Sequence, residues 1–319
     1  MKRVRLQDIA DRLGVSLNTA SRALRDCSDI SLATKERVRA KAKEMGYIPS
    51  NLSSYLSLGK SQIITVIVYN LANCYFSLMA DAVIRELSKH GYQCLLRMCE
   101  KEEAEYEDIV FALANQCVGI ISLINIDKQA NELCEKKEIP VTLIGRTSYY
   151  NSISSFDSND FQGGVLIAKE CIAKGLKRPC YLSPKVKGVI KKRVNGFKNE
   201  LEKANINLDI YECAYEDDIY EFFANAIIEN ENDFVFAYND EIAINIKRLL
   251  KKHRYKKIDI FGFDGIGDRL PIISPINGLS IDWSQVIKDA CENMLERIEK
   301  NDFANTVHNI YPMHIIKKT

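Results

Sequence analysis

The sequence predicts two parts of different fold class: an all-α head with a helix-turn-helix unit over residues 1–49, and a two-lobed α/β body over residues 61–319. Three observations predict this division. Apolar residues near the N-terminus recur at helical spacing, β-rich runs alternate with helical runs from residue 63 onward, and the net charge changes sign between the two parts. At 319 residues the chain is long enough for two or three domains with substantial cores.

An apolar stripe predicts the first helix of the head, over residues 6–13. Its members lie at positions i, i+3, i+4 and i+7 and are Leu6, Ile9, Ala10 and Leu13. Gly14 follows at once, and glycine accepts the left-handed conformation that a tight turn demands. We therefore expect the first helix to end at this glycine.

Two further helices of the head begin with the same signal. Ser16 stands where an N-cap would precede a helix over residues 17–25, and Ser31 precedes a helix over residues 32–45 that Gly46 ends. Two short helices joined by a glycine-containing turn, with a third helix beside them, form a helix-turn-helix unit.

The second helix of such a unit enters the major groove of DNA with its N-terminal residues at the base edges. The residues at these positions are Ser16, Leu17, Asn18, Thr19, Ser21 and Arg22. Asparagine can pair with adenine and arginine with guanine, whereas serine and threonine suit phosphate or base. Ala20, Ala23 and Leu24 face the small core instead. The alternative is a plain three-helix bundle whose polar face has no partner.

Charge is distributed unevenly along the chain. Residues 1–61 carry 12 Lys and Arg against 6 Asp and Glu, a net charge of +6, whereas residues 62–319 carry 32 against 37, a net charge of −5. A basic end on an acidic body indicates a polyanionic partner for that end alone. Taken by itself, the charge is equally typical of a solvated surface.

A hinge helix and linker are predicted over residues 50–60. Leu52 and Leu56 lie four residues apart, so about two turns of helix would align them. A helix this short and rich in serine is marginal in water, and we expect it to form only when docked. Gly59-Lys60-Ser61 resembles the end of a phosphate-binding loop, but Ser54 stands where the first glycine is required, which argues against a nucleotide site.

The body contains two series of alternating strands and helices. The first series has strands over residues 63–68, 92–97, 118–123 and 141–144, and helices over residues 75–90, 102–115 and 128–137. The second has strands over residues 179–182, 209–213, 234–237 and 258–261, and helices from about residues 160, 189, 217 and 241. The chain ends in a returning strand within residues 311–316. Such series build parallel sheets flanked by helices, so two series predict two lobes.

Several classes of protein fit this sequence poorly. The longest apolar stretch, over residues 63–69, is far shorter than the roughly 20 residues that cross a bilayer, and no secretory signal opens the chain. The ten cysteines include no C-x-x-C pair and no neighbouring histidine, so we expect reduced thiols and no metal site. The four histidines lie far apart and no G-x-S-x-G motif is present, which argues against an enzyme. No cofactor is expected.

Six runs in the head fall at the spacing of a known family: Asp8-Ile9-Ala10, Leu13-Gly14-Val15-Ser16, Thr19-Ala20-Ser21-Arg22-Ala23-Leu24, Ile30-Ser31, Thr34-Lys35-Glu36-Arg37-Val38 and Met45-Gly46-Tyr47-Ile48-Pro49. By these runs residues 4–56 resemble the head of the LacI/GalR family of bacterial repressors. The resemblance implies DNA contacts at Leu6, Ser16, Leu17, Asn18, Thr19, Ser21, Arg22, Thr34 and Leu56. Leu17 and Asn18 would set specificity, and Leu56 would wedge into the minor groove. Ser53 and Ser54 stand where the family has Ala-Arg.

The body carries further matching runs, among them Asn73-Cys74-Tyr75-Phe76, Arg193-Val194-Asn195-Gly196-Phe197, Tyr238-Asn239-Asp240 and Gly262-Phe263-Asp264. They resemble the family's periplasmic-binding-protein-like domain. The resemblance implies that the chain crosses between lobes near residues 158, 282 and 301. Lobe 1 would then comprise residues 61–158 and 283–301, and lobe 2 would comprise residues 159–282 and 302–319.

The same resemblance implies an effector site between the lobes. Its polar contacts would be Arg193, Asn239 and Asp264, and its aromatic contacts Tyr75, Phe76 and Trp283. Paired donors and acceptors beside aromatic faces suit a sugar or a sugar derivative. Each residue has a plainer alternative: Arg193 as a surface ion pair, Asp264 as a turn residue and Trp283 as ordinary core.

The sequence therefore favours an effector-gated repressor. The resemblance implies a cytoplasmic bacterial homodimer, associated with the nucleoid when bound, that takes a pseudo-palindromic double-stranded operator and a carbohydrate effector. No leucine heptad follows the body, which favours a dimer over a tetramer. Two alternatives remain: a DNA-binding regulator controlled by a partner protein, and an enzyme fused to a DNA-binding head.

Overall fold

The computed structural model describes residues 4–48, 61–185, 191–214, 218–255, 258–265 and 276–317. Its contacts divide the chain into two units, residues 1–61 and residues 62–319, which are described separately here. The predicted hinge over residues 50–60, with Leu52 and Leu56, lies outside the described residues.

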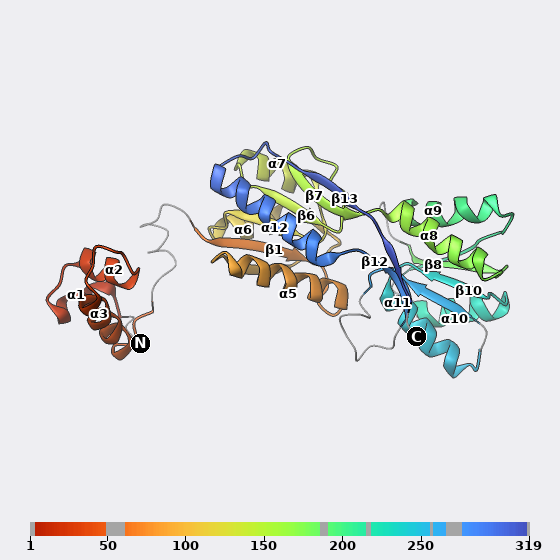
Figure 1. Cartoon of the computed structure of the whole chain (residues 1–319), viewed down its shortest axis with the longest axis horizontal. Coiled ribbons are helices and arrows are strands. Elements are labelled where there is room, and N and C mark those ends of the chain that lie inside the picture. Colours follow the sequence, from red (N-terminus) through yellow and green to blue (C-terminus); the bar gives the residue numbers. More distant parts are fainter. Residues whose placement is uncertain are drawn as a thin grey trace. The chain divides into compact units, whose positions relative to one another are not determined.

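Over residues 4–48 the head consists of three helices around one small core (Figure 1). They are α1 (Leu6–Leu13), α2 (Leu17–Leu24) and α3 (Leu32–Glu44). Gly14 caps α1 at a φ of 66°, the left-handed conformation expected of this glycine. The buried side chains of the core are Ile9, Ala10, Ala20, Ala23, Val38 and Ala42. The helices of the head therefore begin and end within about a residue of their predicted bounds.

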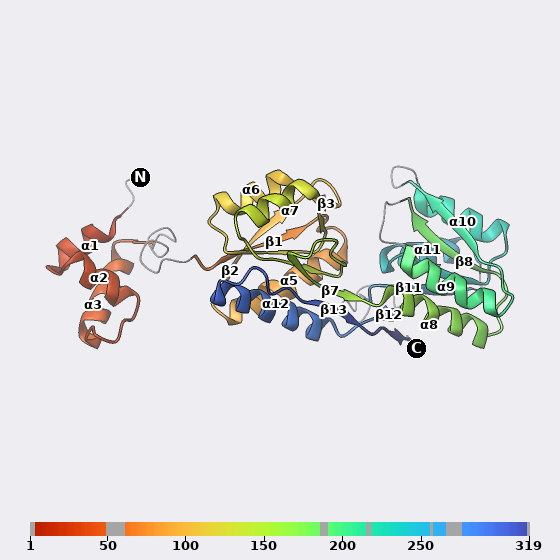
Figure 2. The same cartoon turned by 90° about the horizontal axis from the view of Figure 1, so that it is seen from above.

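The first lobe of the body is built on a six-stranded sheet in the order β13-β7-β6-β4-β1-β2. Its strands are β1 (Ile63–Val68), β2 (Gln93–Met98), β4 (Gly119–Ser122), β6 (Val141–Ile144), β7 (Ile153–Ser158) and β13 (His308–Tyr311). All its pairings are parallel. The helices α6 (Tyr106–Ala114) and α7 (Lys128–Lys136) cover one face, and α5 (Cys74–Lys89) and α12 (Trp283–Lys300) cover the other (Figure 2). Both faces are buried, which explains the apolar runs of its central strands.

The second lobe has a six-stranded sheet in the order β14-β12-β11-β10-β8-β9. Its strands are β8 (Pro179–Pro184), β9 (Asp209–Cys213), β10 (Phe234–Ala237), β11 (Asp259–Gly262), β12 (Asn277–Ser280) and β14 (His314–Ile316). Among the described strands of this lobe, β12 and β14 pair in antiparallel orientation and the other pairings are parallel. One face carries α8 (Asp160–Ala173) and α9 (Lys191–Lys203), and the other α10 (Ile219–Glu229) and α11 (Asp240–Lys252) (Figure 1).

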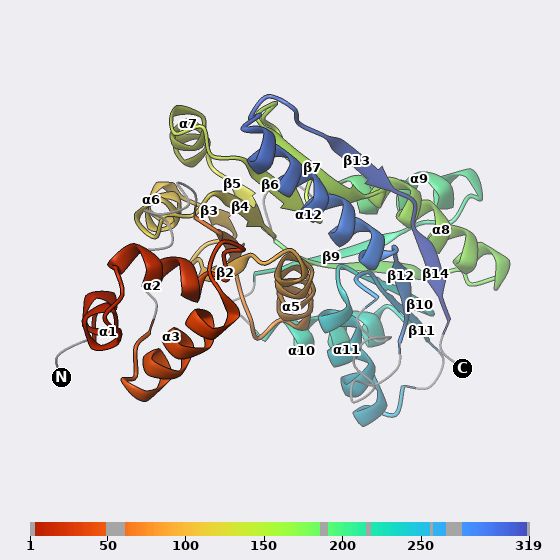
Figure 3. The ribbon, with the colours of Figure 1, turned by 60° about the vertical axis from the view of Figure 1, so that its left-hand side comes forward.

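The third crossing between the lobes differs from its predicted place. The strand β13 pairs with β7 in the first sheet, and β14 pairs with β12 in the second. The chain therefore crosses at residues 312–313, not near residue 301, and residues 302–311 do not belong to lobe 2 (Figure 3). The successive strands β13 and β14 lie in different sheets, so the position of the crossing depends on which distant strand each of them pairs with.

The remaining differences concern a pair of short strands, two polar strands and one long helix. A short strand, β3 (Glu103–Ala104), pairs with β5 (Asn125–Ile126) where the prediction extends a helix back to residue 102. The strands β7 and β12 were not predicted, because their residues are rich in Ser, Asn and Gly rather than in β-branched side chains. The long helix α12 is also absent from the prediction. In the part of the chain that the structure describes, no helix is long and apolar enough to cross a membrane.

Candidate nucleic-acid interface and ligand site

The N-terminal turn of α2 is exposed and rigidly capped. The Ser16 hydroxyl accepts a hydrogen bond from the Thr19 amide at 2.9 Å, and the two hydroxyl groups lie 2.8 Å apart. Such a cap stabilises a helix by about 1 kcal/mol. Leu17 is 46% exposed and Asn18 is exposed as well, while Ala20 and Ala23 are fully buried. The residues predicted to meet base edges therefore lie on the solvent face of α2.

Arg22 is held by an acidic residue that the sequence prediction did not single out. Its Nη2 lies 2.6 Å from Oδ1 of Asp29, and both side chains are partly exposed. The hydrogen bond from Arg22 holds the pKa of Asp29 below its ordinary value. In the same loop, Asp26 forms ion pairs with Lys35 at 3.1 Å and Arg39 at 2.8 Å. Part of the positive charge of the head is thus neutralised by its own carboxylates.

The other predicted DNA-contacting residues lie in different settings. Leu6 packs half-buried against the core of the head, and Ser21 is half-buried on α2. The Thr34 hydroxyl lies 2.9 Å from that of Ser31, the N-cap of α3. Leu56 lies outside the described residues.

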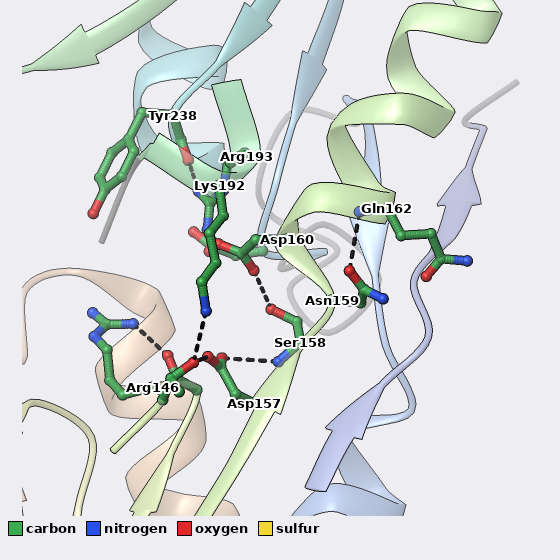
Figure 4. Close-up of polar contacts among 12 residues, drawn as sticks. Arg146, Asp157, Ser158, Asn159, Asp160, Gln162, Lys192, Arg193 and Tyr238 are labelled. Atoms are coloured by element: carbon green, nitrogen blue, oxygen red, sulfur yellow. Dashed lines mark hydrogen bonds and ion pairs between the residues drawn. The ribbon is translucent and has the colours of Figure 1, made fainter. Parts of the chain in front are cut away.

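In the body, Arg193 belongs to a charged cluster at the carboxyl ends of strands from both sheets (Figure 4). Its Nη2 donates to Asp160 at 3.1 Å, its Nη1 donates to the carbonyl of Tyr238, and its guanidinium lies over the ring of Phe263. The Arg193 side chain is only 12% exposed and that of Asp160 only 9%. The ion pair anticipated as an alternative is real, but it is buried between α9 and α8. Among the residues that the structure describes, Arg193 Nε has no hydrogen-bond partner.

Asp264 follows β11 and forms two reciprocal hydrogen bonds with Asp240. The Asp240 amide donates to Asp264 Oδ2 at 3.4 Å, and the Asp264 amide donates to Asp240 Oδ1 at 3.3 Å. Burial raises the pKa of Asp264 to about 6, although Arg193 and the Asp240 hydrogen bond oppose this rise. The next residue, Gly265, has a φ of 66°, so Asp264 also precedes a turn.

The three predicted aromatic residues form a chain of edge-to-face contacts. The ring of Tyr75 lies 5.4 Å from Phe76 and 5.7 Å from Trp283, and all three are buried. Trp283 Nε1 donates to the Asp264 carbonyl at 3.3 Å, which joins this chain to the charged cluster. Burial raises the pKa of Tyr75 well above its ordinary value. A Cβ atom at Gly145 would collide with the Tyr75 hydroxyl, which explains a glycine at this position.

Asn239 has a local structural task. It is the N-cap of α11, and its side-chain oxygen accepts from the Ile242 amide at 2.9 Å. That oxygen is therefore committed to the helix, and the amide nitrogen is the group of Asn239 that a ligand can use.

The structure adds cluster residues that the sequence prediction missed: Arg146, Thr147, Asp157, Asp160 and Lys192 (Figure 4). Arg146 and Thr147 follow β6, and Asp157 is the residue before the last of β7, so both groups lie at carboxyl ends of parallel strands, where ligands gather in α/β folds. The place of Arg146 just after a predicted strand is the sequence feature that could have identified it as a site residue. Lys192 comes from the first turn of α9 and belongs to the other lobe. Among the described residues, no group of three or more His, Cys, Asp or Glu could hold a metal ion.

Two family models match the chain. Residues 5–50 match the model described as bacterial regulatory proteins of the lacI family. Residues 61–301 match the model described as periplasmic binding proteins and the sugar binding domain of the LacI family. The second model alone covers more than half of the chain.

Curated relatives and solved structures agree with these matches. The chain is 26% identical to the HTH-type transcriptional repressor PurR of Vibrio atlanticus, with 98% of each chain covered. It is 27% identical to the sucrose operon repressor of Streptococcus mutans, with 93% of this chain and 94% of the relative covered. A crystal structure of the Lac repressor bound to ONPG matches with a TM-score of 0.81 at 20% identity, covering 99% of both chains. This last likeness concerns the fold.

Proposed function

Because the chain belongs to the LacI family of bacterial regulatory proteins, we propose that the exposed face of α2 reads operator DNA and that the charged cluster of the body binds the controlling effector. The chain is a DNA-binding transcriptional repressor gated by a small-molecule effector, and it is a regulator rather than an enzyme. The observation that carries the proposal is the buried convergence of Arg193, Asp160 and Asp264 at the strand ends of the body.

The roles of the head residues follow from their exposure. Leu17 and Asn18 would contact base edges, because they are exposed at the start of α2. The exposed Ser16 and the half-buried Thr19 and Ser21 would lie near phosphates. Arg22 would reach a guanine or a phosphate once it is aligned by Asp29. Leu6, Thr34 and Leu56 complete the proposed DNA-contacting set.

The effector is proposed to be a sugar or a sugar derivative. The cluster offers guanidinium donors and carboxylate acceptors beside the rings of Tyr75, Phe76 and Trp283, a combination that suits a polyhydroxylated molecule. Structures similar to this chain include one with bound cellobiose and one with bound ribose. Asn239 would contribute its amide nitrogen.

The working assembly is proposed to be a homodimer on a pseudo-palindromic operator, because two-fold symmetric heads match two half-sites. The proposed domains are a head over residues 1–49, a hinge over residues 50–60 and a body over residues 61–319; the division of contacts near residue 61 supports the second boundary. Such a repressor acts in the bacterial cytoplasm, and we place it on the nucleoid when it is bound.

Operator binding measured against a sugar panel tests the proposal. DNA selected by the full-length protein from a random pool serves as operator, and binding is followed by fluorescence anisotropy. We expect one or more sugars to change the operator Kd saturably by about 5- to 150-fold, the usual range of allosteric coupling. Arg193→Gln should abolish this response while operator binding without sugar persists.

The matched control is Arg178→Gln, which removes an exposed arginine of the same lobe that pairs with Glu231. This variant should respond like the wild type. Chemical turnover of a panel sugar, or an operator affinity indifferent to every sugar, would contradict the proposal.

A further inference from the structure

The carboxylates of the cluster are already engaged within the protein. Asp157 accepts from the Thr147 hydroxyl at 2.7 Å and from the Ser158 amide at 2.8 Å. Asp160 accepts from the Ser158 hydroxyl at 2.5 Å and from Arg193 at 3.1 Å. Each of these four carboxylate oxygens thus already accepts one hydrogen bond within the protein before a ligand arrives.

Two cations of the cluster are in the opposite situation. Within the described residues, Arg146 donates only to the adjacent carbonyl of Gly145, at 2.6 Å, and no carboxylate lies within ion-pair distance of it. Lys192 donates only to the Thr147 hydroxyl, at 3.4 Å, and likewise lacks an ion-pair partner in this part of the chain. A guanidinium carries five donors and an ammonium three, so most donors of this pair remain available.

These two cations come from opposite lobes. Arg146 follows β6 of the first sheet, and Lys192 belongs to α9 of the second lobe. Thr147 links them, because its hydroxyl donates to Asp157 and can accept from Lys192. Arg146 also lies close enough to the half-buried Tyr238 of lobe 2 to oppose the rise that burial causes in the pKa of its phenol. Donors from both lobes thus lie beside the same threonine, and among the described residues no carboxylate is within ion-pair distance of either cation.

We propose that the effector carries an anionic group, a phosphate or a carboxylate, that Arg146 and Lys192 bind together from the two lobes. This inference rests on the proposed function, since it names the class of molecule that fills the same site. Charged acceptors form the strongest hydrogen bonds with guanidinium and ammonium groups, and Arg matches the geometry of both anions. A neutral hydroxyl uses an acceptor as well as a donor, whereas Arg146 and Lys192 offer donors alone.

The inference also gives the effector a mechanical effect. An anion held by one lobe alone would leave the angle between lobes free, whereas an anion shared by Arg146 and Lys192 favours the closed arrangement. A ligand shifts such an equilibrium only by binding one state better, and the bridging contact supplies that difference.

Thermal unfolding of the full-length protein in phosphate tests the anion site directly. Wild type is titrated with inorganic phosphate against chloride at equal ionic strength, and the shift in Tm is recorded. We expect a saturable, phosphate-specific rise in Tm, with the apparent Kd for phosphate weakened about ten- to hundredfold in Arg146→Gln and in Lys192→Gln. The matched control, Lys198→Gln, removes an exposed lysine of α9 that pairs with Glu202 and should behave as wild type.

A second panel separates the sources of the anion and the two levels of the proposal. Operator affinity is measured with glucose, glucose 6-phosphate and glucuronate as probes of neutral, phosphorylated and carboxylated sugars. A response to either anionic probe that is lost in Arg146→Gln supports the inference and identifies the anion. The inference is overturned if phosphate gives no specific shift in Tm, or if both variants retain it. Operator control by a neutral sugar in those circumstances would leave the proposed function intact, whereas indifference to all sugars would remove the proposed function too.

Discussion

Three arginines of this protein are held by three kinds of partner. Arg22 pairs with the exposed carboxylate of Asp29, and Arg193 with the buried carboxylate of Asp160. Arg297 is 1% exposed and binds mainly carbonyl groups, those of Val141, Ser152 and Phe303, at 2.8 to 3.1 Å. The planar fork of the guanidinium explains all three, because its donors point in fixed directions that one or several acceptors can meet.

At the residue scale, Arg22→Ala is expected to weaken specific operator binding by about 1 to 3 kcal/mol, since one base contact is worth this much. Lys43→Ala removes an equal charge from an exposed site on α3 and should weaken binding less. Anisotropy titrations at several salt concentrations separate the two effects. If both variants lost the same operator affinity, Arg22 would contribute only through its charge and not through a base contact.

Asp264 predicts a pH dependence of stability. Burial raises its pKa in the folded state from an ordinary value of 3.8 to about 6. The folded state therefore binds more protons than the unfolded state between these values, so stability falls as pH rises from about 4 through 6 and is level above that range.

Asp264→Asn should remove this loss, because it replaces the carboxylate by a neutral group of similar shape. We expect the variant to be about 1 to 2 kcal/mol more stable than wild type at pH 8, and close to it at pH 4, after allowance for partial exposure of the side chain. Urea unfolding at both pH values measures the difference. The surface variant Asp81→Asn serves as control, and a wild type that gains stability toward pH 8 relative to Asp264→Asn would contradict the prediction.

At the element scale, Arg297 connects α12 to the first sheet and to the segment that follows the helix. Arg297, near its C-terminal end, donates to the carbonyl of Val141 on β6, to the hydroxyl of Ser154 on β7 and to the carbonyl of Phe303 beyond the helix. No carboxylate pairs with it within the described residues, and burial lowers the pKa of its guanidinium. Its contribution is therefore the satisfaction of carbonyl groups rather than an ion pair.

Arg297→Leu is expected to destabilise the body by about 2 kcal/mol or more, because buried acceptors then lose their donor. Lys300→Leu, on the same helix, breaks only the exposed pair with Glu296 and should change stability by less than about 1 kcal/mol. Chemical unfolding of both variants provides the comparison. Equal stability of the two variants would show that water replaces the arginine without loss.

At the scale of the whole molecule, the contacts of the chain form two units, and the core of the head is separate from the cores of the body. Scanning calorimetry should therefore give two unfolding transitions. Val38→Ala should lower the free energy of unfolding of the head alone, by roughly 1 to 3 kcal/mol. Phe236→Ala should lower that of the body alone, by about 3 to 5 kcal/mol. A single transition that both variants lower would mean that head and body unfold as one cooperative unit.

Local sequence patterns were sufficient to predict the helices of the head, the alternation of strands and helices in the body, and the family. These features depend on local spacing: Ser16 and Ser31 cap helices whichever core they meet, Gly14 tolerates its turn, and central strands such as β1 are apolar throughout. The predicted Arg193, Asp264 and Trp283 also lie together, since they follow from the same family pattern.

Only the tertiary structure decided the third crossing at residues 312–313, the strand β7 and the charged cluster of Arg146, Thr147, Asp157 and Lys192. A strand as polar as β7 is specified by the neighbours that pair with it, β6 and β13, and the latter lies some 150 residues away in the chain. Whether a charged side chain is paired or available is likewise a property of distant residues. Asp160 and Arg193 pair across two helices, whereas among the described residues no carboxylate lies within ion-pair distance of Arg146 or Lys192.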